Sequence, residues 1–129
     1  MDGKAIAALV EKSGDNWALA LRLRDDGRFN AAANRLYYAL FQAVKAYAVR
    51  TGMASVDEEA GVHGRMKAIV RDENRRDARV FGDAMDLRVK ADYSAASASA
   101  SDFEQAFMFE AENLRLRFAG MAAGKESSR

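Results

Sequence analysis

The stretch FNAAANRLYYALFQAVKAYAVRTG, residues 29–52, decides the fold, because it carries the clearest helical pattern in the chain. Its inward side chains recur at spacings of four and three, which places them on one face of an α-helix. This packing seam consists of Ala33, Tyr37, Leu40, Val44 and Tyr47. Asn30 is a candidate N-cap and Gly52 a candidate stop signal. The pattern predicts a core-facing helix over about residues 30–51.

The rest of the chain also predicts helices. It contains no proline and no sustained alternation of β-branched residues, so strands are not expected. Further helices are expected over residues 3–26, after a cap at Ser55, over residues 77–93, and from Ser101 onward. The helix after Ser55 carries Val62, Met66 and Ile69 on one face, and the last one turns Phe103, Phe107, Ala111, Leu114 and Phe118 inward. The predicted fold class is all-α, an antiparallel four-helix bundle with a possible short fifth helix.

Helix ends and connections are predicted from capping residues and glycines. Ser13 and Gly14 are candidate breaks in the first helix, and DENRRD, residues 72–77, is a candidate bend. Two capping boxes are expected, Ser55 with Glu58 and Ser101 with Glu104. The loop SAASASAS, residues 94–101, is small and polar, so we expect it to be mobile.

Length and composition limit the class of protein. With 129 residues the chain suits one domain, expected as a helical bundle over residues 1–119 with a flexible C-terminal tail over residues 120–129. The chain has 20 Lys and Arg and 19 Asp and Glu, so its net charge is too small to attract a polyanion to the whole surface. A polyanion would have to bind at a local cluster of basic residues. The absence of cysteine and the single His63 argue against a metal site, and no cofactor is expected. We expect a cytoplasmic protein without signal peptide or membrane span.

The stretch LRVKADYS, residues 87–94, places polar groups at the end of a core-facing helix. Phe81, Met85, Arg88 and Asp92 form one row at spacings of four, three and four. Asp92 is therefore placed to accept hydrogen bonds from the Arg88 guanidinium, and Tyr93 adds a hydroxyl. Two interpretations stay open, a helix-end ion pair that only fixes the loop, and a ligand site.

Other polar rows also have two interpretations. Arg35, Tyr38, Gln42 and Lys45 flank the seam of the helix over residues 30–51, as either a solvated face or a site. Arg71, Arg75 and Arg79 repeat every four residues as a candidate phosphate-binding stripe, but nearby acidic residues favour an ordinary solvated face. His63 lies at the margin of an apolar face, where a lone histidine is more often structural than catalytic.

Three segments together resemble the HEPN family, the small all-α higher eukaryote and prokaryote nucleotide-binding domains. Residues 29–52 look like the family's Ala-rich second helix with its Arg-x-Tyr-Tyr-Ala core, and VHGRMKAIV, residues 62–70, is similar to the His-bearing segment that follows. LRVKADYS resembles the Arg-x-x-Ala-Asp-Tyr signature of one bacterial and archaeal branch. The resemblance implies a bundle of four or five helices, often a homodimer, and in many members a partner nucleotidyltransferase.

The resemblance also implies a site. Many members are metal-independent ribonucleases or toxins in which an Arg is followed, after four to six intervening residues, by a His. Arg88 matches that Arg, but Tyr93 stands five places on and no histidine follows His63. A tyrosine hydroxyl is a poor general base near neutral pH. We therefore expect a remodelled polar site that binds nucleotide or RNA through Arg88, Asp92 and Tyr93, joined by Arg35 and Tyr38.

Three functions follow as hypotheses. The first is a module that binds nucleotide or RNA, or that serves as the helical partner of a minimal nucleotidyltransferase in a toxin–antitoxin or defence pair. The second is a metal-independent endoribonuclease that uses Arg88 with Tyr93 or His63. The third is a phosphotransfer bundle that uses His63. Cleavage of RNA in metal-free buffer separates the second from the first.

Overall fold

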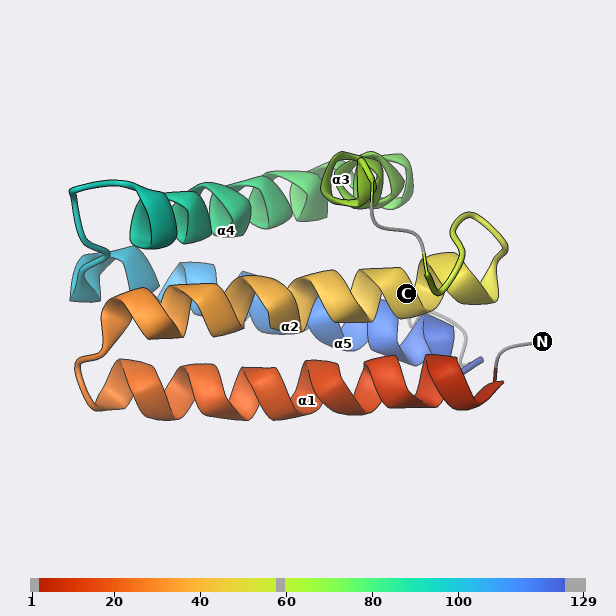
Figure 1. Cartoon of the computed structure of the whole chain (residues 1–129), viewed down its shortest axis with the longest axis horizontal. Helices are drawn as coiled ribbons and strands as arrows, with labels where there is room; N and C mark the ends of the chain where they lie inside the picture. The colour runs from red at the N-terminus through yellow and green to blue at the C-terminus, as the bar shows by residue number, and fades with distance from the viewer. Residues whose placement is uncertain (1–2, 58–59, 125–129) are drawn as a thin grey trace.

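The computed structural model describes residues 3–57 and 60–124, and within them the chain is all-helical, which confirms the predicted fold class. The helices are α1 (Gly3–Asp25), α2 (Phe29–Arg50), α3 (Val62–Glu73), α4 (Arg75–Tyr93), the short 3-10 helix η1 (Ala100–Phe103) and α5 (Gln105–Ala122). Four long helices run along the molecule and alternate in direction, whereas α3 is seen end-on (Figure 1). The short additional helix is therefore α3, which crosses the bundle.

Helix α2 forms the centre of the bundle. It packs against α1, α4 and α5, and the predicted seam residues are buried. Six alanines of α2 are also buried: Ala32, Ala33, Ala39, Ala43, Ala46 and Ala48. Because alanine side chains are small, they leave room for neighbouring helices to pack near the α2 backbone. A helix that is apolar almost all round belongs in a core, and α2 fits that rule.

Helix α1 is continuous through Ser13 and Gly14, so the expected break does not occur. Ser13 is fully buried, and its hydroxyl donates a hydrogen bond to the Ala39 carbonyl of α2 at 2.7 Å. The hydroxyl is thus satisfied across the α1–α2 contact instead of competing with the helix backbone. Gly14 keeps helical geometry and has open space beside it.

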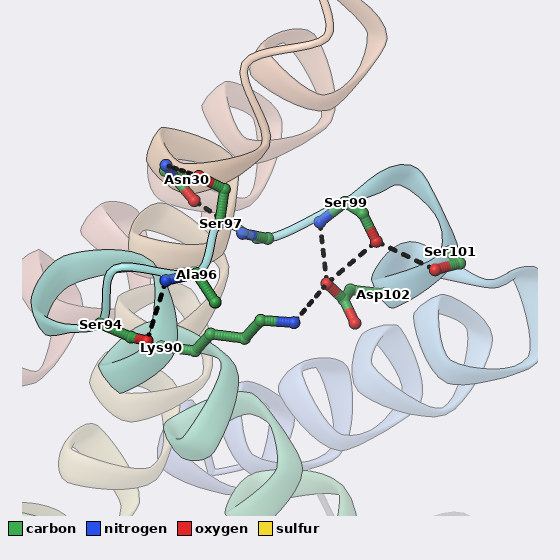
Figure 2. Close-up of polar contacts among 9 residues, drawn as sticks. Asn30, Lys90, Ser94, Ala96, Ser97, Ser99, Ser101 and Asp102 are labelled. Carbon is green, nitrogen blue, oxygen red and sulfur yellow. Dashed lines mark hydrogen bonds and ion pairs between the residues drawn. The ribbon is translucent and has the colours of Figure 1, made fainter.

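Asn30 does not cap α2, contrary to the sequence prediction. The N-cap is Arg28, without a side-chain cap hydrogen bond. Asn30 lies inside the first turn, and its Oδ1 accepts a hydrogen bond from the backbone N–H of Ala98 at 2.8 Å (Figure 2). Its amide nitrogen also lies 3.5 Å from the Ser97 hydroxyl. Asn30 therefore tethers the connection between α4 and α5 through contacts that the sequence did not predict.

The capping box in this region lies two residues earlier than predicted. Ser99 and Asp102 cap η1 reciprocally, and α5 begins only at Gln105 after Glu104, which makes no side-chain cap bond. Lys90 of α4 lies 3.6 Å from the Asp102 carboxylate (Figure 2). The backbone N–H of Ser99 donates a hydrogen bond to the Asp102 carboxylate, and this bond lowers the pKa of that carboxyl group. The other expected box includes Glu58, which lies outside the described residues.

The bend at residues 72–77 is present. Asn74 ends α3 and caps α4, accepting a hydrogen bond from the Asp77 backbone N–H at 3.1 Å. Arg71 therefore belongs to α3 while Arg75 and Arg79 belong to α4, so the candidate arginine stripe is divided between two helices. Asp77 itself is buried and paired with Arg117 of α5.

The last helix extends past the expected start of the tail. Helix α5 continues to Ala122, which is buried and whose carbonyl accepts a hydrogen bond from Arg50 at 3.3 Å. Residues 120–122 thus continue the helix, and Arg50 of α2 contacts its last residue. Residues 125–129 of the expected tail lie outside the described residues. None of the helices that the structure describes is long and apolar enough to span a membrane.

Candidate functional site

The row on α4 passes from core to surface. Phe81 is fully buried and Met85 partly so, while the Arg88 side chain is 16% exposed and that of Asp92 25%. Nε of Arg88 lies 3.3 Å from Oδ2 of Asp92. The Nε–H group nevertheless makes no hydrogen bond with any residue in the described ranges. The pair is therefore an ion pair without the predicted hydrogen bond.

Asn34 explains the position of the Asp92 carboxylate. Its Nδ2 donates a hydrogen bond to Oδ2 of Asp92 at 3.0 Å. This oxygen is also the one nearest Arg88. The amide from α2 thus fixes the carboxylate, and the carboxylate lies beside the guanidinium without closing a bidentate pair.

Three tyrosine rings surround the Arg88 guanidinium. Its Cζ lies 5.6 Å from the ring centre of Tyr37, 5.3 Å from that of Tyr38 and 5.7 Å from that of Tyr93. All three distances fall within the range of cation–π attraction. The Tyr93 hydroxyl also lies 3.5 Å from Nη2, although this ring is 74% exposed. Arg88 thus packs against the rings of Tyr37, Tyr38 and Tyr93, which we call the aromatic wall. The aromatic wall is exposed to solvent at Tyr93.

His63 joins this wall from α3. Its Nδ1 lies 2.5 Å from the Tyr37 hydroxyl, and its ring centre lies 4.8 Å from that of Phe41. Burial, with the nearby Arg88 charge adding to it, lowers the pKa of His63. Burial raises the pKa of Tyr37 above its ordinary value. A protonated phenol therefore donates to Nδ1, so we assign the imidazole proton to Nε2.

Arg35 also lies beside the Tyr38 ring. Its Cζ lies 5.7 Å from the Tyr38 ring centre. Its guanidinium donates to Oδ1 of Asn34 at 2.9 Å and to Oδ1 of Asn16 at 3.2 Å. No carboxylate among the described residues pairs with it. The guanidinium groups of Arg35 and Arg88 outnumber the one carboxylate, and His63 is neutral, so the site carries a local positive charge. The neutral side-chain amides of Asn34 and Asn16 position these charged groups.

The fold brings together the residues predicted for the site, and we name them the Arg88 cluster: Arg35, Tyr38, His63, Arg88, Asp92 and Tyr93, with Tyr37 added by the structure. Sequence reasoning had assigned Tyr37 to the core seam and had missed Asn34 and Asn16. Asn34 precedes Arg35 directly, but only the packing of α2 against α4 shows that it reaches Asp92. Gln42 of the predicted row pairs instead with Asn16 at 2.8 Å.

The chemistry available to the cluster is recognition of an anion beside an aromatic surface. Guanidinium groups match phosphate oxygens, and exposed tyrosine rings stack on unpaired bases. Within the described residues, no three His, Asp or Glu side chains lie close enough to hold a metal ion.

The chain matches a known protein family. A family described as HEPN domain matches residues 6–115. Neither the curated proteins nor the solved structures give a match. The matched range includes every residue of the Arg88 cluster.

Proposed function

The chain belongs to the HEPN domain family, and from that premise we propose that it binds a nucleotide or RNA at the Arg88 cluster. The observation that carries the proposal is the state of the Arg88 guanidinium. It is nearly buried against three tyrosine rings, its Nε–H has no hydrogen-bond acceptor among the described residues, and its carboxylate neighbour does not form a bidentate pair. A phosphate oxygen would accept from the guanidinium where the site opens to solvent, beside Nη2 and the exposed Tyr93 ring.

We also propose that this module acts as the helical partner of a minimal nucleotidyltransferase in a toxin–antitoxin or defence pair, and that it is a homodimer. The support is the likeness of LRVKADYS to the Arg-x-x-Ala-Asp-Tyr signature. A nucleotidyltransferase reading frame beside the gene would favour the paired system.

A ribonuclease is the second candidate, because His63 lies in the same cluster as Arg88. The low pKa of His63 keeps its ring neutral near pH 7, as a general base requires. However, Nδ1 accepts from Tyr37 and Nε2 carries the proton in that arrangement, so the free nitrogen is a donor. Binding therefore fits the geometry better than base catalysis. Incubation of the protein with RNA in metal-free buffer, with His63→Ala beside wild type, distinguishes the two.

Phosphotransfer through His63 fits less well. The imidazole packs against the rings of Tyr37, Tyr38 and Phe41 instead of projecting from the helix, and one ring nitrogen is occupied. Phosphorylation of His63 by a kinase would support that function.

The test is RNA and nucleotide binding by wild type, Arg88→Lys, Asp92→Asn and Tyr93→Phe, with denaturant unfolding of each protein. We expect Arg88→Lys to retain most of the stability and to lose binding by at least about tenfold, because an ammonium cannot reproduce the planar guanidinium. Arg79→Lys, at an exposed position of α4, is the matched control and should bind normally. Normal binding by all three cluster variants would refute the site.

A further inference from the structure

A groove runs along the molecule between α1 and α5. The two helices are antiparallel (Figure 1), and α1 packs mainly on α2 while it touches α5 in few places. Two hollows open where they meet. The first, of about 430 Å³, lies between the end of α1 and the start of α5, and its apolar walls include Trp17, Leu21, Met108 and Phe109. The second, of about 450 Å³, lies at the other end of both helices, and its apolar walls include Ile6, Val10 and Ala122. We name this feature the α1–α5 groove.

Helix α1 presents to the α1–α5 groove a row with the spacing of a helix-packing seam. The row recurs at intervals of three and four and consists of Ala7, Val10, Gly14, Trp17, Leu21 and Arg24. All of these except Gly14 line one of the two hollows. A Cβ atom at Gly14 would meet nothing within 4 Å, so no neighbouring side chain fills the groove between the hollows.

One cation lies midway along the α1–α5 groove. Arg115 stands seven residues after Met108 and seven before Ala122, which line the first and second hollows. Its Cζ lies 5.4 Å from the Trp17 ring centre, within the range of cation–π attraction. The side chain is partly exposed and makes no ion pair with a carboxylate in residues 3–57 and 60–124. Burial lowers the pKa of Arg115, so a carboxylate brought beside it would stabilise its charged form.

We propose that the α1–α5 groove docks an amphipathic α-helix of a partner protein, which places one apolar side chain in each hollow and a carboxylate between them beside Arg115. Met108 and Ala122 are fourteen residues apart on α5, so the groove spans about 21 Å, or about four turns of a docked helix. Side chains fourteen residues apart share one helix face, and a residue seven from each lies on that face as well. Docking also covers Phe109, which is 65% exposed at the edge of the first hollow.

The position of the charge favours a partner helix over other occupants. A fatty acid carries its carboxylate at the end of the chain, whereas Arg115 lies midway between the two apolar hollows. A second copy that docked groove to groove about a two-fold axis would bring the two Arg115 guanidinium groups together, and like charges repel. The Arg88 cluster belongs to α2, α3 and α4, so the inference does not depend on the proposed binding of nucleotide or RNA.

Synthetic peptides test the docking, and Trp17 reports it, because it is the only tryptophan in the chain and lines the first hollow. The probe is an alanine-rich peptide of about 20 residues, stapled as a helix on its outer face, with two leucines fourteen residues apart and a glutamate midway. It should shift the Trp17 emission with a micromolar dissociation constant. A peptide with glutamine in place of the glutamate should bind at least tenfold more weakly, and one with alanines in place of both leucines should not bind. Equal binding of the glutamate and glutamine peptides, or no binding of the glutamate peptide, would overturn the proposal.

Protein variants locate the peptide. Gly14→Leu fills the groove between the hollows and should abolish binding, whereas Gly64→Leu, at an exposed glycine of α3 that also has open space beside it, should bind like wild type. Arg115→Gln should bind the glutamate and glutamine peptides equally. Denaturant unfolding verifies that each variant is folded. Normal binding by Gly14→Leu would place the peptide elsewhere and refute the groove.

Two further measurements identify the alternative occupants. Laurate is titrated into wild type and Gly14→Leu, and both proteins are sedimented without peptide. Binding of laurate that Gly14→Leu abolishes, with no binding of the glutamate peptide, would assign the α1–α5 groove to an acyl chain. A self-associated species that Gly14→Leu dissociates and Gly64→Leu does not would assign it to a second copy. Either result would overturn the partner helix.

Discussion

His63 is the only histidine in the chain, so its protonation can be followed without overlap. Burial and then the Arg88 charge lower its pKa from the usual 6.5. We expect the ring proton signals in an NMR titration to give a pKa below 6.5. In Arg88→Gln the pKa should move part of the way back, because burial remains. A pKa of 6.5 or more in wild type would contradict the placement of His63 against the aromatic wall.

The same shift predicts how stability changes with pH. Since the folded pKa is lower than the unfolded one, the unfolded chain binds more protons in the window between them, and the free energy of unfolding rises with pH there. Stability should therefore fall as the pH drops from about 6.5. Denaturant unfolding at pH 7 and pH 5 measures this slope, and His63→Asn should reduce it. If wild type and His63→Asn lose the same free energy of unfolding between pH 7 and pH 5, the loss comes from carboxylates and not from His63.

For individual residues, the sequence predicted contacts within one helix better than contacts between two helices. The spacing of Arg88 and Asp92 placed them side by side, and so did that of Arg35 and Tyr38. The link from Tyr37 to His63 joins α2 to α3, and that from Asn34 to Asp92 joins α2 to α4. Such contacts depend on how two helices pack, which the periodicity of either one does not contain.

At the scale of elements, two neighbouring positions of α1 have opposite expected effects. Ser13→Ala removes a buried hydrogen bond to Ala39 and should lower the free energy of unfolding by about 1 kcal/mol. Gly14→Ala adds a methyl group where nothing lies within 4 Å and should raise it by up to about 1 kcal/mol. Denaturant unfolding of both variants checks the pair. Stabilisation by Ser13→Ala would contradict the α1–α2 contact.

The loop between α4 and α5 should loosen when Asn30 is replaced. In Asn30→Ala the Ala98 N–H loses its acceptor at 2.8 Å, so its amide hydrogen should exchange at least tenfold faster. Ser97→Ala removes only the longer 3.5 Å contact and should have a smaller effect. Equal exchange in wild type and Asn30→Ala would mean that the buried Ala98 side chain alone holds the loop.

Helix existence was predictable because each helix has an apolar stripe, whereas helix ends and loops depend on partners far away in the chain. Composition alone suggested a mobile 94–101 segment, but Asn30 of α2 contacts Ser97 and Ala98 within it, and Lys90 of α4 pairs with Asp102 just after it. Gly14 looked like a break because glycine is a poor helix former, yet the packing of Ser13 beside it outweighs that preference.

For the whole molecule, the boundary of the bundle can be tested by truncation. A chain that ends at Gly120 loses the buried Ala122 and its hydrogen bond from Arg50. We expect this chain to be less stable than one that ends at Gly124 by about 1–2 kcal/mol, which is roughly 4–8 °C in melting temperature. Equal melting temperatures would restore the boundary at residue 119 that the sequence suggested.

The burial of α2 has a consequence for the energetics of binding. Tyr37 is buried in the core and Arg88 packs against it, so these two members of the Arg88 cluster are in place before the proposed ligand binds. Binding then requires little ordering of side chains and loses little conformational entropy. The exposed Tyr93 is the member left to reorient. Calorimetry should accordingly show a small entropic penalty, and that penalty should shrink further when Tyr93 is replaced by alanine.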